Sequence, residues 1–281
     1  MKIESIKYMS EVIGKGYEID IHEHYCLTGP NGIGKTTVLV FAHALAELIA
    51  TGSDLALLKA LRQEKPDSWG RIQYIWNRVL DFMEITLADG TTAGFKTVNA
   101  ANGEFIVSHN GKQHILQSVS LKDYLPTIPF MDIERHCYSG EFLATLIKMN
   151  ENNLSKQDIE ELCTKILGLD AIPKFFYEVP KEADFKSRKL WVNELTKWED
   201  TFSHGEIEMI RLSLCLAIAK KTNKLIFIDG AENGLHIMSQ QQLAKLYEQY
   251  NSNGLQIIYS TYSPSCLVRE HCFDLWEGER Y

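Results

Sequence analysis

The sequence lacks the features that would place it in several special classes of protein. Its 281 residues contain no CxxC pair among the 6 cysteines, no repeat, no low-complexity segment and no sustained heptad pattern. No apolar run approaches the roughly 18 residues that cross a bilayer. Disulfide scaffolds, zinc ribbons, membrane spans and long coiled coils are therefore not predicted. The N-terminus lacks the apolar stretch and cleavage site of a signal peptide, so we expect a cytoplasmic protein with reduced thiols.

The sequence also contains fewer basic residues than acidic residues. There are 29 Lys and Arg residues against 37 Asp and Glu residues, for a formal net charge of -8. Such a chain has no overall attraction to DNA or to an anionic membrane, although a local basic patch would still allow DNA binding. With 45% hydrophobic and 23% charged residues, the composition is that of an ordinary globular protein with enough chain for a large core.

Residue periodicity and turn signals predict alternating strands and helices. Two or three strands are expected within 2–28, then a helix at 36–50 and a second helix from Asp54 that Pro66 ends. The later predicted elements are a strand at 127–133, helices at 140–169, 206–221 and 239–250, and strands at 225–228 and 255–259.

Between these regions, three glycine-containing turn signals predict a different kind of structure. Asp89-Gly90, Asn102-Gly103 and Asn110-Gly111 are typical of tight hairpins, because glycine readily adopts the positive φ that such turns require. Residues 82–120 are therefore predicted to form an antiparallel meander.

The sharpest local pattern is a glycine-rich segment between a predicted strand and a predicted helix. It reads Gly29-Pro30-Asn31-Gly32-Ile33-Gly34-Lys35-Thr36-Thr37 and satisfies the P-loop pattern, G-x-x-x-x-G-K followed by Ser or Thr. Glycines let successive backbone N–H groups surround phosphate oxygens, and the helix N-terminus adds positive potential. Lys35 can reach the β- and γ-phosphates, and the Thr36 hydroxyl can ligate Mg²⁺. The candidate nucleotide-binding residues here are Gly29, Asn31, Gly32, Gly34, Lys35, Thr36 and Thr37.

Two further patterns carry polar groups that suit phosphate or metal. An apolar strand at 225–228 ends at Asp229, whose carboxylate could hold Mg²⁺ through water opposite Thr36 or simply start a turn. Ser203-His204-Gly205-Glu206 opens a predicted helix, where Ser203 and Gly205 could form a second anion site or Ser203 could be an ordinary N-cap.

Taken in order, these segments resemble the motifs of ABC-type ATPase heads. The soluble branch with the structural-maintenance-of-chromosomes (SMC), recombination-repair and overcoming-lysogenisation-defect ATPases is the most similar. Residues 29–37 match its Walker A motif "GPNGxGKTT", 203–206 its signature "SSGE", 228–236 its "IDEPENxLHP", and 260–264 its "STHSP". The resemblance implies an α/β P-loop NTPase fold of the ABC-ATPase type, with a mixed sheet core, an antiparallel β-subdomain and a short helical lobe.

That resemblance also implies one ATPase domain over 1–281. A P-loop lobe with the meander would occupy 1–135, a helical lobe and connection 136–199, and the signature, Walker B and switch region 200–281.

The departures from the family pattern concern hydrolysis. Gly230 stands where the family usually has the Glu that activates water, and Tyr262 stands where it has the switch His. The resemblance therefore implies a head that binds ATP and Mg²⁺ but hydrolyses ATP slowly or not at all. Glu232 could replace the missing base, or it could face solvent or a neighbouring subunit. Tyr8 or Tyr17 could stack on adenine, or belong to the core.

By the same resemblance, two copies would form a head-to-tail homodimer in which Ser203 and Gly205 face the nucleotide of the partner. Such a dimer would serve as an ATP-stabilised regulatory scaffold for a separate, nuclease-like effector in phage defence or genome maintenance, including DNA repair. Two alternatives remain open: an active ATPase that uses Glu232 as base, and a nucleic-acid-binding module with a vestigial P-loop.

Overall fold

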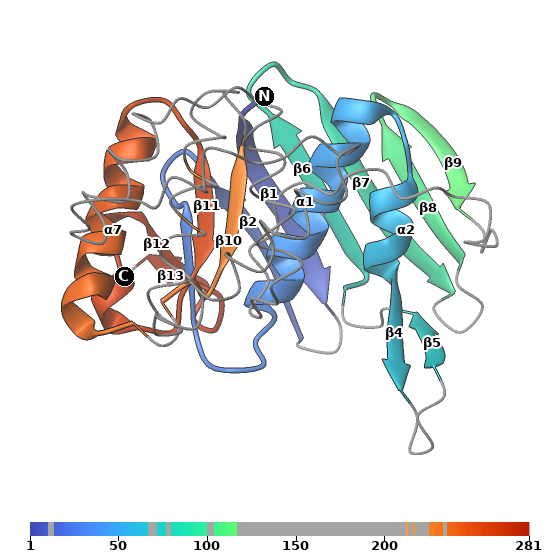
Figure 1. Cartoon of the computed structure of the whole chain (residues 1–281). Helices are drawn as coiled ribbons and strands as arrows, with labels where there is room; N and C mark the ends of the chain where they lie inside the picture. Colours follow the sequence, from blue (N-terminus) through green and yellow to red (C-terminus); the bar gives the residue numbers. More distant parts are fainter. Residues whose placement is uncertain are drawn as a thin grey trace, which may run out of the picture. The chain divides into compact units, whose positions relative to one another are not determined.

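The structure is a computed structural model of the chain (Figure 1). It describes residues 1–10, 14–66, 72–76, 80–99, 104–116, 225–232 and 235–280, together with 212 and 216. The chain folds as two compact units. The first comprises Met1–Asp132, Ile258–Tyr262 and Arg269–Tyr281, and the second comprises Ile133–Ile257 and Ser263–Val268.

The first unit contains a six-stranded antiparallel sheet with the order β2-β1-β6-β7-β8-β9 (Figure 1). Buried and more exposed side chains alternate along β6, as expected for a strand with one face in the core. The predicted meander is thereby confirmed. The strands are β1 (Ile3–Ser10), β2 (Lys15–Asp20), β6 (Phe82–Leu87), β7 (Thr92–Asn99), β8 (Glu104–His109) and β9 (Lys112–Leu116).

Two of the three predicted glycine turns connect strands of this sheet. Where β6 turns into β7, Asp89 Oδ1 accepts a hydrogen bond of 2.9 Å from the Thr91 N–H. Where β8 turns into β9, Asn110 and Gly111 have φ values of 50° and 73°, the left-handed pair that a two-residue hairpin requires. The turn predicted at Asn102-Gly103 lies outside the described residues.

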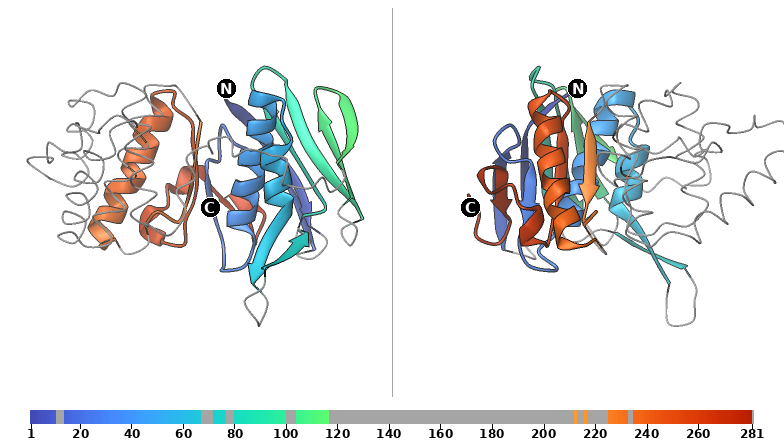
Figure 2. Two further views of the ribbon diagram at one scale, coloured as in Figure 1. Left: turned by 45° about the vertical axis from the view of Figure 1, so that its right-hand side comes forward. Right: turned by 60° about the vertical axis from the view of Figure 1, so that its left-hand side comes forward.

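Helix α1 (Lys35–Thr51) packs against β6 and β7 (Figure 2). The Phe41 ring on α1 lies 5.0 Å from the Phe95 ring on β7, measured between centroids. The helix ends at Gly52, whose N–H bonds the Leu48 carbonyl at 2.8 Å with a φ of 69°. The helix predicted at 36–50 is confirmed, with one more residue at each end.

The second helix is shorter than predicted. Helix α2 (Leu55–Leu61) ends before Pro66, and the residues after it form β4 (Arg62–Pro66), paired antiparallel with β5 (Ile72–Trp76). The prediction of a helix up to Pro66 is therefore wrong beyond Leu61. Pairing with β5 gives the backbone of 62–66 its hydrogen-bond partners, and Pro66 lies at the strand end, where its missing N–H costs least.

Three short parallel strands make up the rest of the first unit's core. Strand β3 (Cys26–Thr28) lies between β11 (Ile257–Ser260) and β12 (Cys272–Asp274), and β13 (Glu279–Arg280) pairs antiparallel with β12. All residues of β3, β11 and β12 are buried, as is usual for parallel strands covered on both faces. With β1, β2 and β3, the strands predicted within 2–28 are confirmed, as is the strand predicted near 255–259.

The second unit contains β10 (Ile226–Asp229) and α7 (Ile237–Ser252), both close to their predicted positions. The Ile226 N–H bonds the Gln256 carbonyl at 3.0 Å, so β10 runs beside the segment that enters β11. Helix α7 packs on the 3₁₀ turn η3 (Pro264–Cys266), and the Cys266 thiol lies 3.4 Å from the Gln240 carbonyl. A second 3₁₀ turn, η4 (Arg269–His271), precedes β12 in the first unit.

Several predicted elements lie outside the described residues: the strand at 127–133 and the helices at 140–169 and 206–221, apart from two residues.

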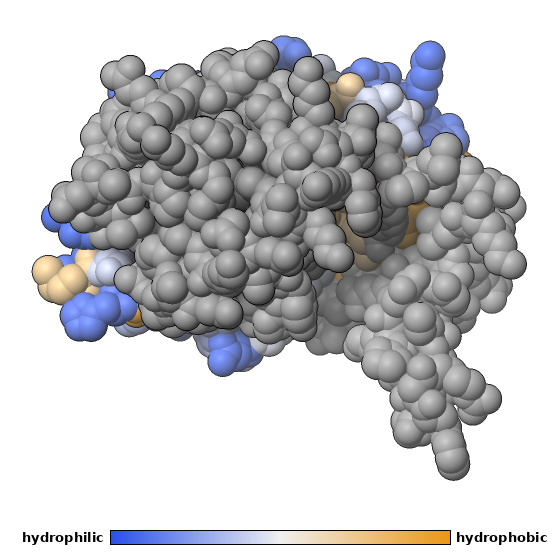
Figure 3. All heavy atoms as spheres, viewed as in Figure 1, coloured by the Kyte–Doolittle hydropathy of each residue, from blue (hydrophilic) through white to orange (hydrophobic). Residues whose placement is uncertain are grey.

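In the described surface of Figure 3, small apolar areas lie between hydrophilic ones. Ile237 and Met238, at the start of α7, are 54% and 58% exposed. None of the helices in the described residues combines the length and hydropathy needed to cross a membrane.

Candidate functional site

Three loops of the first unit follow the carboxyl ends of its parallel strands. Strand β3 leads into residues 29–34, β11 leads into Thr261 and Tyr262, and β12 leads into a turn at 274–278. Adjacent parallel strands end at the same edge of a sheet, and this edge is where open α/β sheets bind ligands. The candidate site is therefore built from the residues of these loops.

Loop 29–34 leaves the N-terminus of α1 open to an anion. Gly29, Gly32 and Gly34 have φ values of 130°, 82° and 103°, a region that side-chain-bearing residues rarely adopt. Gly34 is the N-cap of α1, so no side chain caps the helix, and its first turn contains no acidic residue. The first N–H groups of α1 and the positive end of its dipole are thus not neutralised by a local carboxylate.

Lys35 is buried beneath this loop. Only 2% of the residue is exposed, and its Nζ donates to the carbonyl oxygens of Gly29 at 2.5 Å and Pro30 at 3.0 Å. A buried ammonium is stable only when its N–H groups have partners, and the loop carbonyls provide them. The lysine that the P-loop pattern requires therefore holds its positive charge inside the loop.

Tyr262 covers the same ammonium from the end of β11. The Lys35 Nζ lies 3.8 Å from the centroid of the Tyr262 ring, within the range of a cation–π interaction. Tyr262 is itself 37% exposed, so its ring separates the buried ammonium from the surface. The residue at the predicted switch position thus contacts the predicted phosphate-binding lysine directly.

The other predicted loop residues lie nearer the surface. Asn31 and Gly32 are exposed, and Gly29 and Gly34 are partly exposed. In the first turn of α1, Thr36 is exposed and Thr37 is partly exposed, positions from which a hydroxyl can meet a ligand at the helix N-terminus.

The turn at 274–278 lies against the first glycine of the loop. The Leu275 N–H bonds the Thr28 carbonyl at 3.0 Å, next to Gly29. A Cβ on Gly29 would lie 3.3 Å from Asp274 Oδ1 and 3.6 Å from the Trp276 backbone nitrogen. The φ of 130° therefore favours glycine at position 29, and a Cβ there would also make a tight contact with Asp274.

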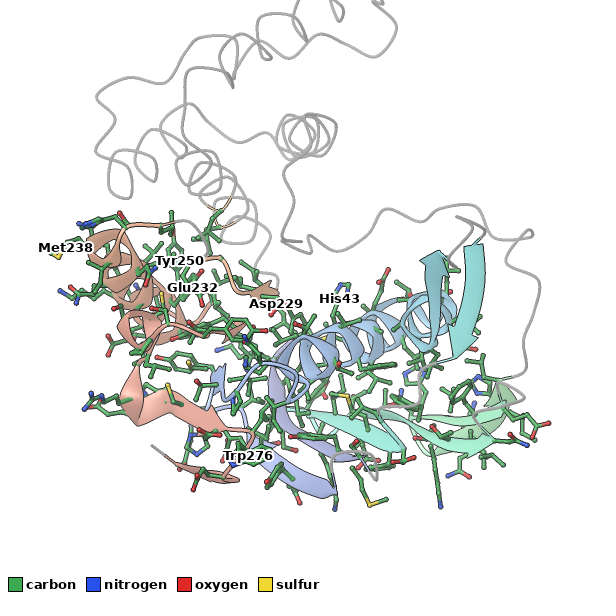
Figure 4. The ribbon with its side chains drawn as sticks, turned by 90° about the horizontal axis from the view of Figure 1, so that it is seen from below. His43, Asp229, Glu232, Met238, Tyr250 and Trp276 are labelled. Atoms are coloured by element: carbon green, nitrogen blue, oxygen red, sulfur yellow. The ribbon has the colours of Figure 1, made fainter. Side chains whose placement is uncertain are left out.

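Asp229 and Glu232 belong to the second unit (Figure 4). Asp229 is the last residue of the buried strand β10 and is partly exposed, and Gly230 follows with a φ of 60°. Glu232 is only 5% exposed, and its backbone carbonyl accepts from the Leu235 N–H at 3.1 Å. The alternative in which Glu232 faces solvent is therefore wrong.

The structure brings two of the predicted site residues into contact with a third. Lys35 contacts both Gly29, at the start of the loop, and Tyr262, at the end of β11. Ser203 and Gly205 lie outside the described residues. Within the part of the chain that the structure describes, no three His, Cys, Asp or Glu side chains form a metal-binding group, so any Mg²⁺ would need phosphate oxygens and water as further ligands.

Sequence reasoning did not find the turn at 274–278. Its residues are far from the P-loop in the chain, and their closeness arises only from the pairing of β12 with β3. The one local signal is the order Asp274-x-Trp276-x-Gly278 after an apolar strand, in which an Asp carboxylate accepts from backbone N–H groups two and three residues later.

Comparisons with known proteins agree with this arrangement at the level of the fold. No model of a protein family matches the sequence, and no curated protein matches it either. Among solved structures, the SMC head domain from Thermotoga maritima is similar with a TM-score of 0.51 and 14% identity, over 95% of this chain and 91% of that one. An SMC head bound to the C-winged helix domain of ScpA also has a TM-score of 0.51, with 13% identity over 98% and 94% of the two chains. The chain therefore has the fold of the SMC head domains, the ABC-type ATPase fold that its four ordered motifs predicted.

Proposed function

We propose that the chain binds ATP and Mg²⁺ at loop 29–37 and hydrolyses ATP slowly or not at all. The observation that carries this proposal is an asymmetry between two sets of residues. The phosphate-binding set is complete, with three glycines of positive φ, an uncapped helix N-terminus and Lys35 beneath the loop. The hydrolytic set is not, because Gly230 has no side chain and Tyr262 has no imidazole.

The residues present fit the triphosphate and its metal ion. The Lys35 ammonium would leave the Gly29 and Pro30 carbonyls for the β- and γ-phosphate oxygens, and the N–H groups in the first turn of α1 would bind the adjacent oxygens. Thr36 and Asp229 would hold Mg²⁺, which neutralises phosphate charge when bound. In this role Tyr262 has to move from the ammonium before a phosphate takes its place.

ATP that is not consumed can act as a structural ligand. A ligand present at 100 times its dissociation constant stabilises the state that binds it by about 2.7 kcal/mol. We propose that this energy closes a head-to-tail homodimer, with Ser203 and Gly205 of one copy against the nucleotide of the other. The exposed Ile237 and Met238, which follow Asp229 and Glu232 in the chain, supply apolar surface for such a contact.

The dimer would act as a scaffold for a separate effector, nuclease-like in chemistry, in phage defence or genome maintenance. Support for a separate partner comes from the similar SMC head that is bound to a domain of ScpA. We place the protein in the cytoplasm.

The decisive experiment measures ATP binding and ATP turnover in one preparation with Mg²⁺. Calorimetry gives the dissociation constant, phosphate release gives the rate, and Lys35→Ala is the matched control. Micromolar binding by the wild type, with phosphate release no faster than in the control, is the expected result. Turnover clearly above the control would contradict the slow-hydrolysis proposal, and absence of ATP binding would contradict the whole of it.

One observation favours a second candidate, an active ATPase with Glu232 as base. Glu232 is buried two residues beyond Gly230, and its carboxylate could accept a proton from the attacking water. In that case Glu232→Gln abolishes turnover and leaves ATP binding intact. The third candidate, a nucleic-acid-binding module, would instead show DNA affinity that Lys35→Ala does not change.

A further inference from the structure

The turn after β12 is closely hydrogen-bonded for a surface turn. Asp274 is only 6% exposed, and its Oδ1 accepts from the Trp276 N–H at 2.7 Å and the Glu277 N–H at 3.2 Å. The Gly278 N–H closes the turn on the Asp274 carbonyl at 2.8 Å. A buried carboxylate with two backbone donors fixes the backbone at Trp276 in one conformation.

Aromatic side chains support the turn from behind. A Cβ on Gly278 would lie 2.2 Å from the Tyr17 ring, so only glycine fits there, and the Tyr17 hydroxyl donates to the Trp276 carbonyl at 3.4 Å. Tyr17 also meets the Tyr8 and Phe273 rings edge-on, with centroids 5.9 Å and 5.5 Å away. Tyr17 is thus a support for the turn.

Trp276 is the large side chain that this supported turn leaves at the surface. It is 52% exposed, while its neighbours Phe273 and Leu275 are buried. Its backbone nitrogen lies 3.6 Å from the position of a Cβ on Gly29, the first residue of the phosphate-binding loop (Trp276 is labelled in Figure 4). The backbone that carries this exposed indole thus lies beside the phosphate-binding loop, and an exposed indole has the chemistry to stack on a nucleobase.

We propose that the Trp276 indole is the base-stacking platform of the nucleotide held by loop 29–37. This inference rests on the proposed ATP binding and adds the residue that recognises the base. Stacking tolerates any base, because every base has a π-face, so Trp276 distinguishes a nucleoside triphosphate from an inorganic polyphosphate. Of the two tyrosines considered for this role, Tyr8 is 5% exposed in the core, and Tyr17 contacts the turn that carries Trp276, so we assign the role to Trp276.

The test compares two probes that share phosphates but differ in the base. Dissociation constants of ATP and inorganic tripolyphosphate, each with Mg²⁺, are measured by calorimetry for the full-length wild type, Trp276→Ala and Trp276→Phe. Ile115→Ala, which truncates an exposed apolar side chain on β9, is the matched control. A thermal unfolding curve for each variant checks that the fold persists.

We expect Trp276→Ala to weaken ATP binding about tenfold, within the range measured for base–aromatic stacking, and to leave tripolyphosphate binding unchanged. Trp276→Phe, which retains a smaller stacking ring, loses less. Unchanged ATP affinity in Trp276→Ala, or an equal loss for both probes, overturns the inference but not the proposed function. If the wild type binds neither probe, both are overturned.

Discussion

The loop after β3 and the turn after β10 carry the residues that we propose for ATP binding and for ATP hydrolysis, and the two sets differ in completeness. The loop has every group that phosphate binding requires, from the glycines to the buried ammonium of Lys35. The turn has Asp229, but Gly230 leaves the position of the general base without a side chain. Because separate segments carry the residues proposed for the two functions, a substitution can remove one function while the other persists. Substitutions in either segment can test this contrast.

The largest effect on ATP affinity should come from a substitution in the phosphate-binding loop. In Lys35→Ala the ammonium is lost, and with it two charge-assisted hydrogen bonds to phosphate, so ATP affinity should fall roughly a thousandfold. Calorimetric titration with ATP and Mg²⁺ measures the loss. A thermal unfolding curve is the control for the bonds that Lys35 makes to Gly29 and Pro30. Retained affinity in a folded variant would mean that phosphate is not bound at this loop.

The second effect comes from restoring the hydrolytic half. The double variant Gly230→Glu with Tyr262→His should raise phosphate release about a hundredfold, the low end of what a positioned general base contributes. Gly230 has a φ of 60°, so any side chain costs about 1–2 kcal/mol there, and Gly230→Gln with Tyr262→His is the control of equal strain. Equal rates in the two double variants would show that the missing carboxylate does not limit hydrolysis.

A smaller effect should come from uncovering Lys35. Tyr262→Ala removes a ring that covers the ammonium, so ATP no longer competes with it and should bind about tenfold more tightly. Tyr262→Phe retains the ring and should bind ATP as the wild type does. Weaker binding in Tyr262→Ala would instead indicate that the tyrosine contacts the bound nucleotide.

The smallest effect concerns the helix that carries the loop. Burial lowers the pKa of His43 on α1 below its ordinary value of 6.5, and Glu47 partly opposes the shift. As the pH falls, the unfolded chain therefore takes up this proton before the folded chain does. The free energy of unfolding that neutral His43 contributes above pH 6.5 is lost below it, by at most about 1.4 kcal/mol per pH unit. Urea unfolding at pH 5 and pH 7.5 measures the loss, and His43→Gln should reduce it. An unchanged difference between the two pH values in His43→Gln would assign it to other groups.

The features that could be predicted from the sequence are those that residues close together in the chain determine. The P-loop, helix α1 and the hairpin at Asn110-Gly111 follow from glycines, caps and periodicity within a few residues. The ABC-type fold followed because four motifs stand in a fixed order along the chain.

The rest depended on partners distant in sequence. Residues 62–66 became a strand because β5 was available to pair with them. The contact between Gly29 and the turn at 274–278 depends on the pairing of β12 with β3. Residues adjacent in the chain carry no signal for such contacts.

The position of β3 between β11 and β12 has a consequence for how the protein is made. The strand that leads into the phosphate-binding loop is synthesised early, whereas both of its neighbours come from the opposite end of the chain. A growing polypeptide on the ribosome can form the meander and α1, but β3 cannot pair with its neighbours until β11 and β12 emerge. The proposed nucleotide affinity should therefore be acquired only after β11 and β12 have left the ribosome, which would make ATP binding a reporter of the pairing of β3 with these strands.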